Sequence, residues 1–268
     1  MQGTQAVVAR ELLTVFRSRS YWVLLAGTLV VLFGMASLGS GPEAGYLPTA
    51  LDLLLPLELL VPAVAIALGY PPIVGDAQRG ELEVLETYPL PAGGYVLGTY
   101  IGRAVALLTL LAVPLSVLAV YIRVTVEPGV TTIATSQGVD SILLFVRFGV
   151  LTVSFALTVL AIVLAVAALA WSRQVALVFA IAVFGLVVVG LDILLLRGFT
   201  ANIIGADRLT TAIALSPTSA YRGLVFETVL SPAQNPDVRS GSLLASSLGL
   251  LAWTAVSLGI TTVAVARR

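Results

Sequence analysis

Three residue types are missing from this chain of 268 residues: it has no cysteine, no histidine and no lysine, so all 14 basic residues are arginine. Without cysteine or histidine, the chain cannot form disulfides, Ser-His-Asp or Cys-His catalytic groups, or thiolate and imidazole metal sites. Without lysine, it cannot build a Walker A loop, whose lysine contacts the phosphates of ATP. We therefore expect a chain that is not itself an enzyme and binds no metal.

Charge is also scarce, at 10% of residues, whereas 59% are apolar and the mean hydropathy is +1.05. Soluble domains carry about 25% charged and about 45–50% apolar residues. The 14 arginines are balanced by 14 acidic residues, so the chain has no net field that would attract nucleic acid. Composition therefore predicts a membrane protein with no nucleic-acid partner.

Six stretches are long enough to cross a lipid bilayer, which takes about 20 predominantly apolar residues. They are residues 21–38, 51–73, 96–122, 142–170, 175–196 and 243–266. The stretches are continuously apolar and do not alternate, which favours helices over the strands of a β-barrel. We predict an all-α, polytopic membrane protein forming one domain over residues 1–268.

The placement of arginine predicts the orientation. If the N-terminus is cytoplasmic, seven arginines lie inside, in the terminal segments and short loops: Arg10, Arg17, Arg19, Arg79, Arg173, Arg267 and Arg268. The outer loop 39–50 holds no arginine, the outer loop 123–141 holds one, and the long loop 197–242 holds four. In such a long loop, arginines far from the spans have less influence on the orientation. We therefore expect a multi-pass protein of the cell membrane with both termini in the cytoplasm.

The segment before the first span has a helical pattern. Val8, Leu12, Val15 and Phe16 fall on one side of a helix, and Arg10, Thr14, Arg17 and Ser18 fall on the other. This predicts an amphipathic helix in the membrane interface, with its arginines, including Arg19, near anionic headgroups. The alternative is a polar tail that only satisfies the positive-inside rule.

The inner loop between spans two and three is unusually charged, with five ionisable residues: Asp76, Arg79, Glu81, Glu83 and Glu86. Leu82 and Leu85 share one helical face, and Pro89 and Pro91 stop the helix. We interpret the loop as a short acidic amphipathic helix that docks a soluble partner. The alternative is a solvated loop whose charges keep it out of the lipid.

Six ionisable residues lie within or at the edges of the spans: Asp52, Glu58, Arg103, Arg147, Asp192 and Arg197. Charges in a bilayer normally have a partner or face water. Glu58 is the deepest acid, and we expect it to pair with Arg147 or to line a substrate path, with a protonated buried carboxyl as the alternative. Four of the others, Asp52, Arg147, Asp192 and Arg197, are expected mainly to anchor the spans at the outer interface.

Proline and glycine add expectations about helix geometry. Pro56 and Pro62 in span two, and Pro114 in span three, each remove a backbone donor and favour a kink. Gly94, Gly98 and Gly102 recur every four residues and allow close helix contact, most simply within the chain.

The last outer loop, residues 197–242, is longer than loops without secondary structure or function usually are in compact domains. Ser216 and Pro217 favour a helix start there, with serine as the cap and proline in the first turn. We expect short helices at the outer surface between spans five and six, which cap an exit path or receive an extracytoplasmic partner protein.

Three segments, in this order, resemble the permease subunits of ABC-2 type ATP-binding-cassette exporters. Arg10-Glu11-Leu12 with Phe16-Arg17-Ser18-Arg19 is similar to the interfacial helix of that family. Residues 76–90, D-A-Q-R-G-E-L-E-V-L-E-T-Y-P-L, are similar to its acidic segment E-x₃-G-T-L-E-x-L-L-x-x-P-L, with Asp76 and Glu81 in place of the usual Glu and Thr. Residues 215–222, L-S-P-T-S-A-Y-R, with Tyr221 and Arg222 at the end, are similar to the N-P-x-x-A-F-R segment of the nitrous-oxide-reductase maturation permeases (NosY-type).

The resemblance implies that the acidic loop contacts a separate ATPase subunit, which binds the ATP, so this chain needs no cofactor. It further implies two permease chains, most simply a homodimer, with two ATPase chains. The function would be export or an extracytoplasmic maturation step related to copper or another metallocentre. Any copper would be handled by partners, because this chain has no soft cysteine or histidine ligands and its only methionines are Met1 and Met35.

Other functions stay open at this point. A membrane scaffold or assembly factor that transports nothing fits the same sequence. An ion-driven secondary transporter would show an inverted repeat and more ionisable residues at mid-span, and an intramembrane aspartyl protease would need two facing aspartates.

Overall fold

Every regular element of the computed structural model is helical over the residues that it describes, which are 2–78, 91–126, 140–201, 205, 211–230 and 242–267. The all-α prediction is therefore confirmed. The helices are α1 (Gln2–Arg17), α2 (Arg19–Leu38), η1 (Pro42–Ala44), α3 (Tyr46–Gly69), α4 (Pro71–Gln78), α6 (Ala92–Thr125), α7 (Ile142–Leu169), α8 (Arg173–Gly185), η2 (Leu186–Gly190), α9 (Leu191–Thr200), η3 (Ile213–Leu215), α11 (Pro217–Val225), η4 (Phe226–Leu230) and α12 (Leu243–Ala266).

Among the described residues, six helical stretches are long and apolar enough to cross a membrane, as the sequence predicted. The predicted span 243–266 coincides with α12, and 142–170 exceeds α7 by one residue. The second span starts earlier than expected, at Tyr46, because Asp140 binds the first backbone amides of α3 from another part of the chain.

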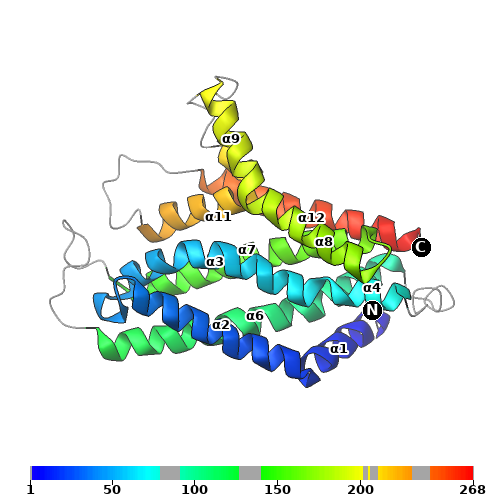
Figure 1. The fold of residues 1–268 in the computed structure, drawn as a ribbon, viewed down its shortest axis with the longest axis horizontal. Helices are drawn as coiled ribbons and strands as arrows, with labels where there is room; N and C mark the ends of the chain where they lie inside the picture. The colour runs from blue at the N-terminus through cyan, green and yellow to red at the C-terminus, as the bar shows by residue number, and fades with distance from the viewer. Residues whose placement is uncertain are drawn as a thin grey trace.

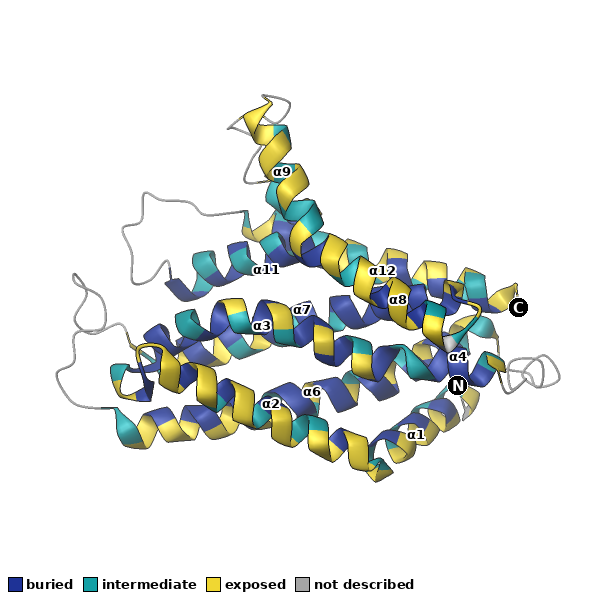
Figure 2. Ribbon diagram, in the orientation of Figure 1, coloured by how far each residue is buried: buried dark blue, intermediate teal, exposed yellow. Residues whose placement is uncertain are grey.

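The helices form an elongated bundle around α7 (Figures 1 and 2). This helix packs against α3, α6, α8, α11 and α12, and most of its side chains are buried. Both chain termini and α4 lie at one end of the bundle, here named the terminal end (Figure 1). The opposite end, where η1 and the start of α7 lie, is named the loop end (Figure 1).

The N-terminal helix α1 packs along the first half of α6. Its most buried side chains are Val7, Glu11 and Val15, spaced by four residues. Two of the glycines singled out in the sequence make this contact close: a Cβ at Gly98 would lie 2.8 Å from Val7, and one at Gly102 would lie 2.5 Å from Glu11. The expected close contact is therefore present within the chain.

Helix α3 continues through both of its prolines, so the break comes later than the sequence suggested. It ends at Gly69, and α4 begins at Pro71. Because Pro71 and Pro72 lack backbone N–H groups, the hydrogen-bond ladder is interrupted there. The two helices nevertheless form one apolar stretch from Tyr46 to Gln78.

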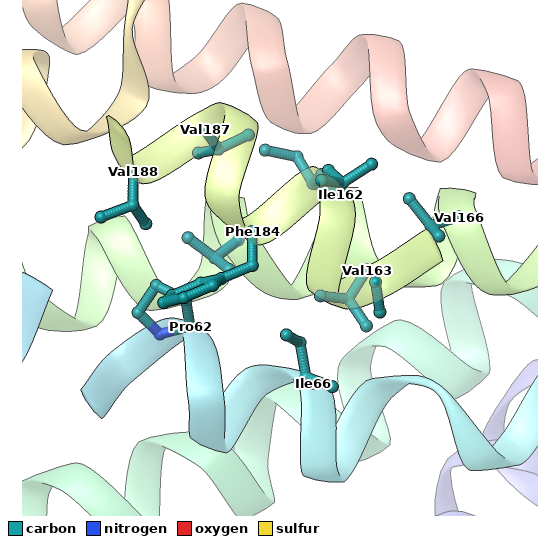
Figure 3. Close-up of a pocket in the computed structure, with 11 residues that line it drawn as sticks. Pro62, Ile66, Ile162, Val163, Val166, Phe184, Val187 and Val188 are labelled. Atoms are coloured by element: carbon teal, nitrogen blue, oxygen red, sulfur yellow. The ribbon is translucent and has the colours of Figure 1, made fainter. Parts of the chain in front are cut away.

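The fifth span bends at η2, a short π-helical segment. Beyond it, α9 turns away from the bundle and has no buried residue (Figures 1 and 2). Residues of the bend line a wholly apolar pocket together with α3, α7 and α8. Pro62, Phe184 and Val187 are among its lining residues (Figure 3). A π-helical turn is a common cause of a sharp helix bend.

Helix α11 enters the bundle, whereas the sequence placed it at the outer surface. It starts at Pro217, and the Ser216 side chain accepts a hydrogen bond from the backbone N–H of Ser219 as its cap. Arg147, five residues into α7, binds the carbonyl of Thr228 in η4, whereas Thr152, ten residues into α7, binds Tyr221 in α11. The N-terminal part of α11 therefore lies deeper in the bundle than η4, as a helix that crosses only about half its depth.

Candidate functional site

An ionic network with two buried carboxylates joins α1, α4 and α6 at the terminal end. Its five residues, named the terminal cluster, are Arg10, Glu11, Asp76, Tyr95 and Arg103. Arg10 Nη2 donates to Asp76 Oδ2 over 2.6 Å, and the Tyr95 hydroxyl donates to the same oxygen over 2.8 Å. Arg10 Nη2 also contacts Glu11 Oε1 at 2.9 Å, and Arg103 Nε donates to Glu11 Oε2 over 2.8 Å.

The two carboxylates of the terminal cluster are buried, with Glu11 and Asp76 each 3% exposed. Two arginines balance them, which a buried charge requires because removal from water is costly. Burial lowers the pKa of the Arg10 guanidinium, but Asp76 and Glu11 raise it by more, through hydrogen bonds and charge, so that the net pKa lies above its ordinary value. The cluster therefore ties α1 to α4 and α6.

The structure places Asp76, one of the residues predicted to dock a partner, inside the bundle. Its carboxylate faces into the bundle, where Arg10 and Tyr95 bind it. Arg79, Glu81, Glu83 and Glu86 lie outside the described residues. Arg17 and Arg19 are exposed on or just after α1, in keeping with the polar side predicted from the sequence.

A second polar network lies half-way along the bundle and joins α3, α9 and α11. Its five residues, named the mid-bundle cluster, are Glu58, Asp192, Ser216, Ser219 and Arg222. Arg222 binds Glu58 through two parallel hydrogen bonds, Nε to Oε1 over 2.9 Å and Nη2 to Oε2 over 2.5 Å. Such bidentate arginine–carboxylate pairs combine strength with fixed geometry.

Asp192 completes the mid-bundle cluster. Its Oδ1 accepts hydrogen bonds of 2.6 Å from the hydroxyls of both Ser216 and Ser219, and its Oδ2 lies 3.8 Å from Arg222 Nη1. A carboxylate at the N-terminus of α11 is also favoured by the helix dipole. The hydrogen bond to Glu58 raises the pKa of Arg222 above its ordinary value, and burial lowers it by less.

The predicted partner of Glu58 is wrong. Glu58 pairs with Arg222, 164 residues away, whereas Arg147 donates to the carbonyl of Thr228. Arg222 was expected in an outer loop, and only the burial of α11 brings it to α3. Asp52 accepts a hydrogen bond from the backbone N–H of Ser40.

Two residues were not predicted. Tyr95, 1% exposed, completes the binding of Asp76, and Asp140 binds the amides of Tyr46 and Leu47 at the start of α3. Tyr95 directly follows Gly94 in the glycine stripe, which is the only signal that pointed to this face. Tyr221, which was predicted, is fully buried, stacks on Phe155 and shares a hydrogen bond with Thr152.

Comparison with known proteins identifies the kind of molecule that carries these clusters. The profile of the ABC-2 family transporter proteins matches residues 5–268. The chain belongs to the ABC-2 transporter family. The resemblance inferred from its three segments is therefore confirmed.

Two relatives of this ABC-2 permease carry the same name, "Probable ABC transporter permease protein NosY". The protein from Stutzerimonas stutzeri is 29% identical over 216 residues, which cover 76% of this chain and 75% of that protein. The protein from Pseudomonas aeruginosa is 32% identical over 123 residues, or 42% of this chain and 44% of that protein. The chain is thus the membrane permease subunit of an ABC transporter, and its family implies an ATPase partner.

Proposed function

We propose that this permease couples ATP hydrolysis by a separate ATPase chain to export, or to a maturation step on the far side of the membrane. The observation that carries this proposal is the terminal cluster. It fixes α4 to α1 and α6 directly before the charged segment that follows Gln78. A docking segment can transmit force only if the helix before it is fixed to the bundle. The hydrogen bonds of Asp76 with Arg10 and Tyr95 fix α4 in this way.

A continuous connection leads from that segment to the middle of the bundle. Asp76 lies on α4 and Glu58 on α3, and these helices form one stretch that is broken only at Pro71. Glu58 in turn binds Arg222 on α11. A displacement of α4 would therefore be transmitted through α3 to α11. It would also reach α9, because Asp192 on α9 binds Ser216 and Ser219 at the start of α11.

The proposed assembly contains two copies of this permease and two ATPase chains in the cell membrane. The arginine bias places the terminal end in the cytoplasm, where the ATPase binds, and the loop end outside, where a partner protein would bind. The NosY-type relatives favour a maturation step. Because the chain has no cysteine or histidine, any copper in that step is bound by partners.

The test is co-purification of the tagged permease in detergent, followed by identification of the bound proteins. We expect a P-loop ATPase. Replacing Glu81, Glu83 and Glu86 together by glutamine should weaken its retention or uncouple ATP hydrolysis, with membrane insertion unchanged. Glu43→Gln, at an exposed carboxylate of the loop end, is the control and should leave retention unchanged.

Normal retention and normal coupling in the triple variant would overturn the assignment of the acidic segment. Recovery of the permease without any ATPase from cells that express both chains would overturn the coupling itself. Reconstitution in vesicles with the ATPase then separates export, which moves a solute, from maturation, which changes only an outer partner.

A further inference from the structure

Two charged side chains of the mid-bundle cluster are partly exposed although they lie deep in the bundle. Glu58 lies 12 residues after Tyr46, about 18 Å from the start of α3 at roughly 1.5 Å per residue, and its carboxylate is buried. The side chains of Arg222 and Asp192, which meet at this depth, are 36% and 23% exposed. The cluster therefore reaches a surface of the molecule at mid-depth.

The helix arrangement explains why that surface is uncovered. The chain bends at η2, and α9 leaves the bundle next to the N-terminus of α11 (Figure 1). No residue of α9 is buried, and α11 crosses only about half of the bundle. The clustered charges lie where these two helices and α3 meet, and Ser219, which is partly exposed, adds a hydroxyl to the polar surface.

Lipid is a poor neighbour for this surface. An exposed guanidinium and an exposed carboxylate at mid-depth are disfavoured against acyl chains, and such residues in membrane proteins face water-filled cavities or each other. Here Arg222 and Asp192 do contact each other, but both keep exposed atoms. Water on this face would solvate those atoms.

We propose that the mid-bundle cluster lines a water-filled vestibule that opens toward the loop end and attracts cations over anions. Two carboxylates, Glu58 and Asp192, meet a single guanidinium, Arg222, so the cluster carries a net charge of −1. The ligand class that it favours is a polar or singly charged cationic group. The side of the membrane rests on the orientation proposed above, whereas the water content and the charge preference do not.

Other charges around the cluster do not reverse this preference. Arg197 lies five residues beyond Asp192 on α9, and Arg147 binds Thr228, six residues beyond Arg222. These are about 8–9 Å farther along their helices, close to the screening length of about 8 Å at physiological ionic strength. Glu227, on η4, is the residue before Thr228 and adds another negative charge to this part of the chain.

The absence of cysteine gives a direct test, because an introduced cysteine is the only thiol in the chain. Ser219→Cys places a thiol beside Asp192. Intact cells that express the permease with its ATPase are treated with a membrane-impermeant methanethiosulfonate, and the modified fraction is measured from the mass of the purified protein. We expect Ser219→Cys to react.

Two controls separate water from mere exposure. Thr218→Cys, the neighbouring residue, is fully buried and should not react. Leu251→Cys is 65% exposed on the apolar surface of α12, about 12 Å from the start of that helix, and should not react because it faces lipid. Leu196→Cys, one turn beyond Asp192 on α9, is a second probe that should also react. It replaces Ser219→Cys if that variant does not fold.

The charge preference is measured with two reagents of similar size, methanethiosulfonate ethyltrimethylammonium and methanethiosulfonate ethylsulfonate. Each rate is divided by that for a free thiol in solution. One net negative charge within a few ångströms should favour the cation by about tenfold. In the Asp192→Asn background, where the net charge of the cluster is zero, the ratio should fall toward one.

Each of three results would overturn the proposal. Protection of both probes would show that lipid or a second copy of the chain covers the face. Reaction only after the cells are permeabilised would show that the vestibule does not open toward the loop end. Equal normalised rates for the two reagents would remove the cation preference.

Discussion

The ion pair between Glu11 and Arg103 should be a main source of stability at the junction of α1 and α6. Both side chains are nearly inaccessible, at 4% and 10% exposure, and their atoms are 2.8 Å apart. Arg103→Met leaves the terminal cluster with a net charge of −1, and Glu11→Gln leaves it with +1. Removing one partner of a buried pair costs about 3–5 kcal/mol, because the other charge stays buried.

We expect each single variant to unfold at a clearly lower temperature. For soluble domains of 150–250 residues, 1 kcal/mol corresponds to about 2–4 °C in Tm, so the expected loss is on the order of 6–20 °C. The measurement is thermal unfolding in detergent followed by tryptophan fluorescence. Arg17→Met is the matched control, since Arg17 is exposed on the same helix, and its Tm should change by less than about 2 °C.

The double variant distinguishes a charge effect from lost packing. Glu11→Gln with Arg103→Met restores a net charge of zero, so its loss should be smaller than the sum of the two single losses by about 1–3 kcal/mol. Strict additivity of the two losses, or single losses below about 1 kcal/mol, would refute the claim that balanced charge holds α1 against α6.

Two further outcomes are expected. Glu58→Gln and Arg222→Gln should each impair transport or maturation more than ATPase binding, because they loosen α11 from α3 and leave the terminal end unchanged. Co-purification measures ATPase binding, and activity assays measure transport or maturation. An equal loss of ATPase binding would contradict this expectation. Gly102→Ala should displace α1, because its Cβ would lie 2.5 Å from Glu11. Gly93→Ala, whose Cβ would have its nearest neighbour at 3.8 Å, should be tolerated. Limited proteolysis of α1 compares the two variants, and equal protection would contradict the expected close contact.

Hydropathy was sufficient to find the six spans because each is apolar over most of its length, and the bilayer sets the length that is needed. It misjudged the details where another part of the chain intervenes. Asp140 starts α3 early, and a π-helical turn bends the fifth span at a run, Leu186-Val187-Val188-Val189-Gly190, whose composition is ordinary for a membrane helix. Neither effect has a local signal in the sequence.

The polar residues were harder to place than the apolar ones. The sequence singled out Glu58, Asp192 and Arg222 as unusual, but not as neighbours, since their separations along the chain show no helical spacing. The amphipathic pattern of α1 predicted an apolar face, yet Glu11 lies on the buried side because Arg103 and Arg10 neutralise it. Periodicity describes one helix, whereas ion pairs depend on how two helices pack.

The two clusters differ in a way that bears on how the permease would move. The terminal cluster has two carboxylates and two guanidinium groups, and its carboxylates are sealed from solvent, so separating its members would expose unpaired buried charge. In the mid-bundle cluster, one of the two carboxylates is not sealed: the Asp192 side chain is 23% exposed and lies 3.8 Å from Arg222, which is bonded to Glu58. A shift of α3 can therefore be met there by a change of partner or by water, at a lower cost than at the terminal end. Since α4 and α3 connect the two clusters, force applied beyond Gln78 should leave the terminal cluster intact and rearrange the contact between α3 and α11.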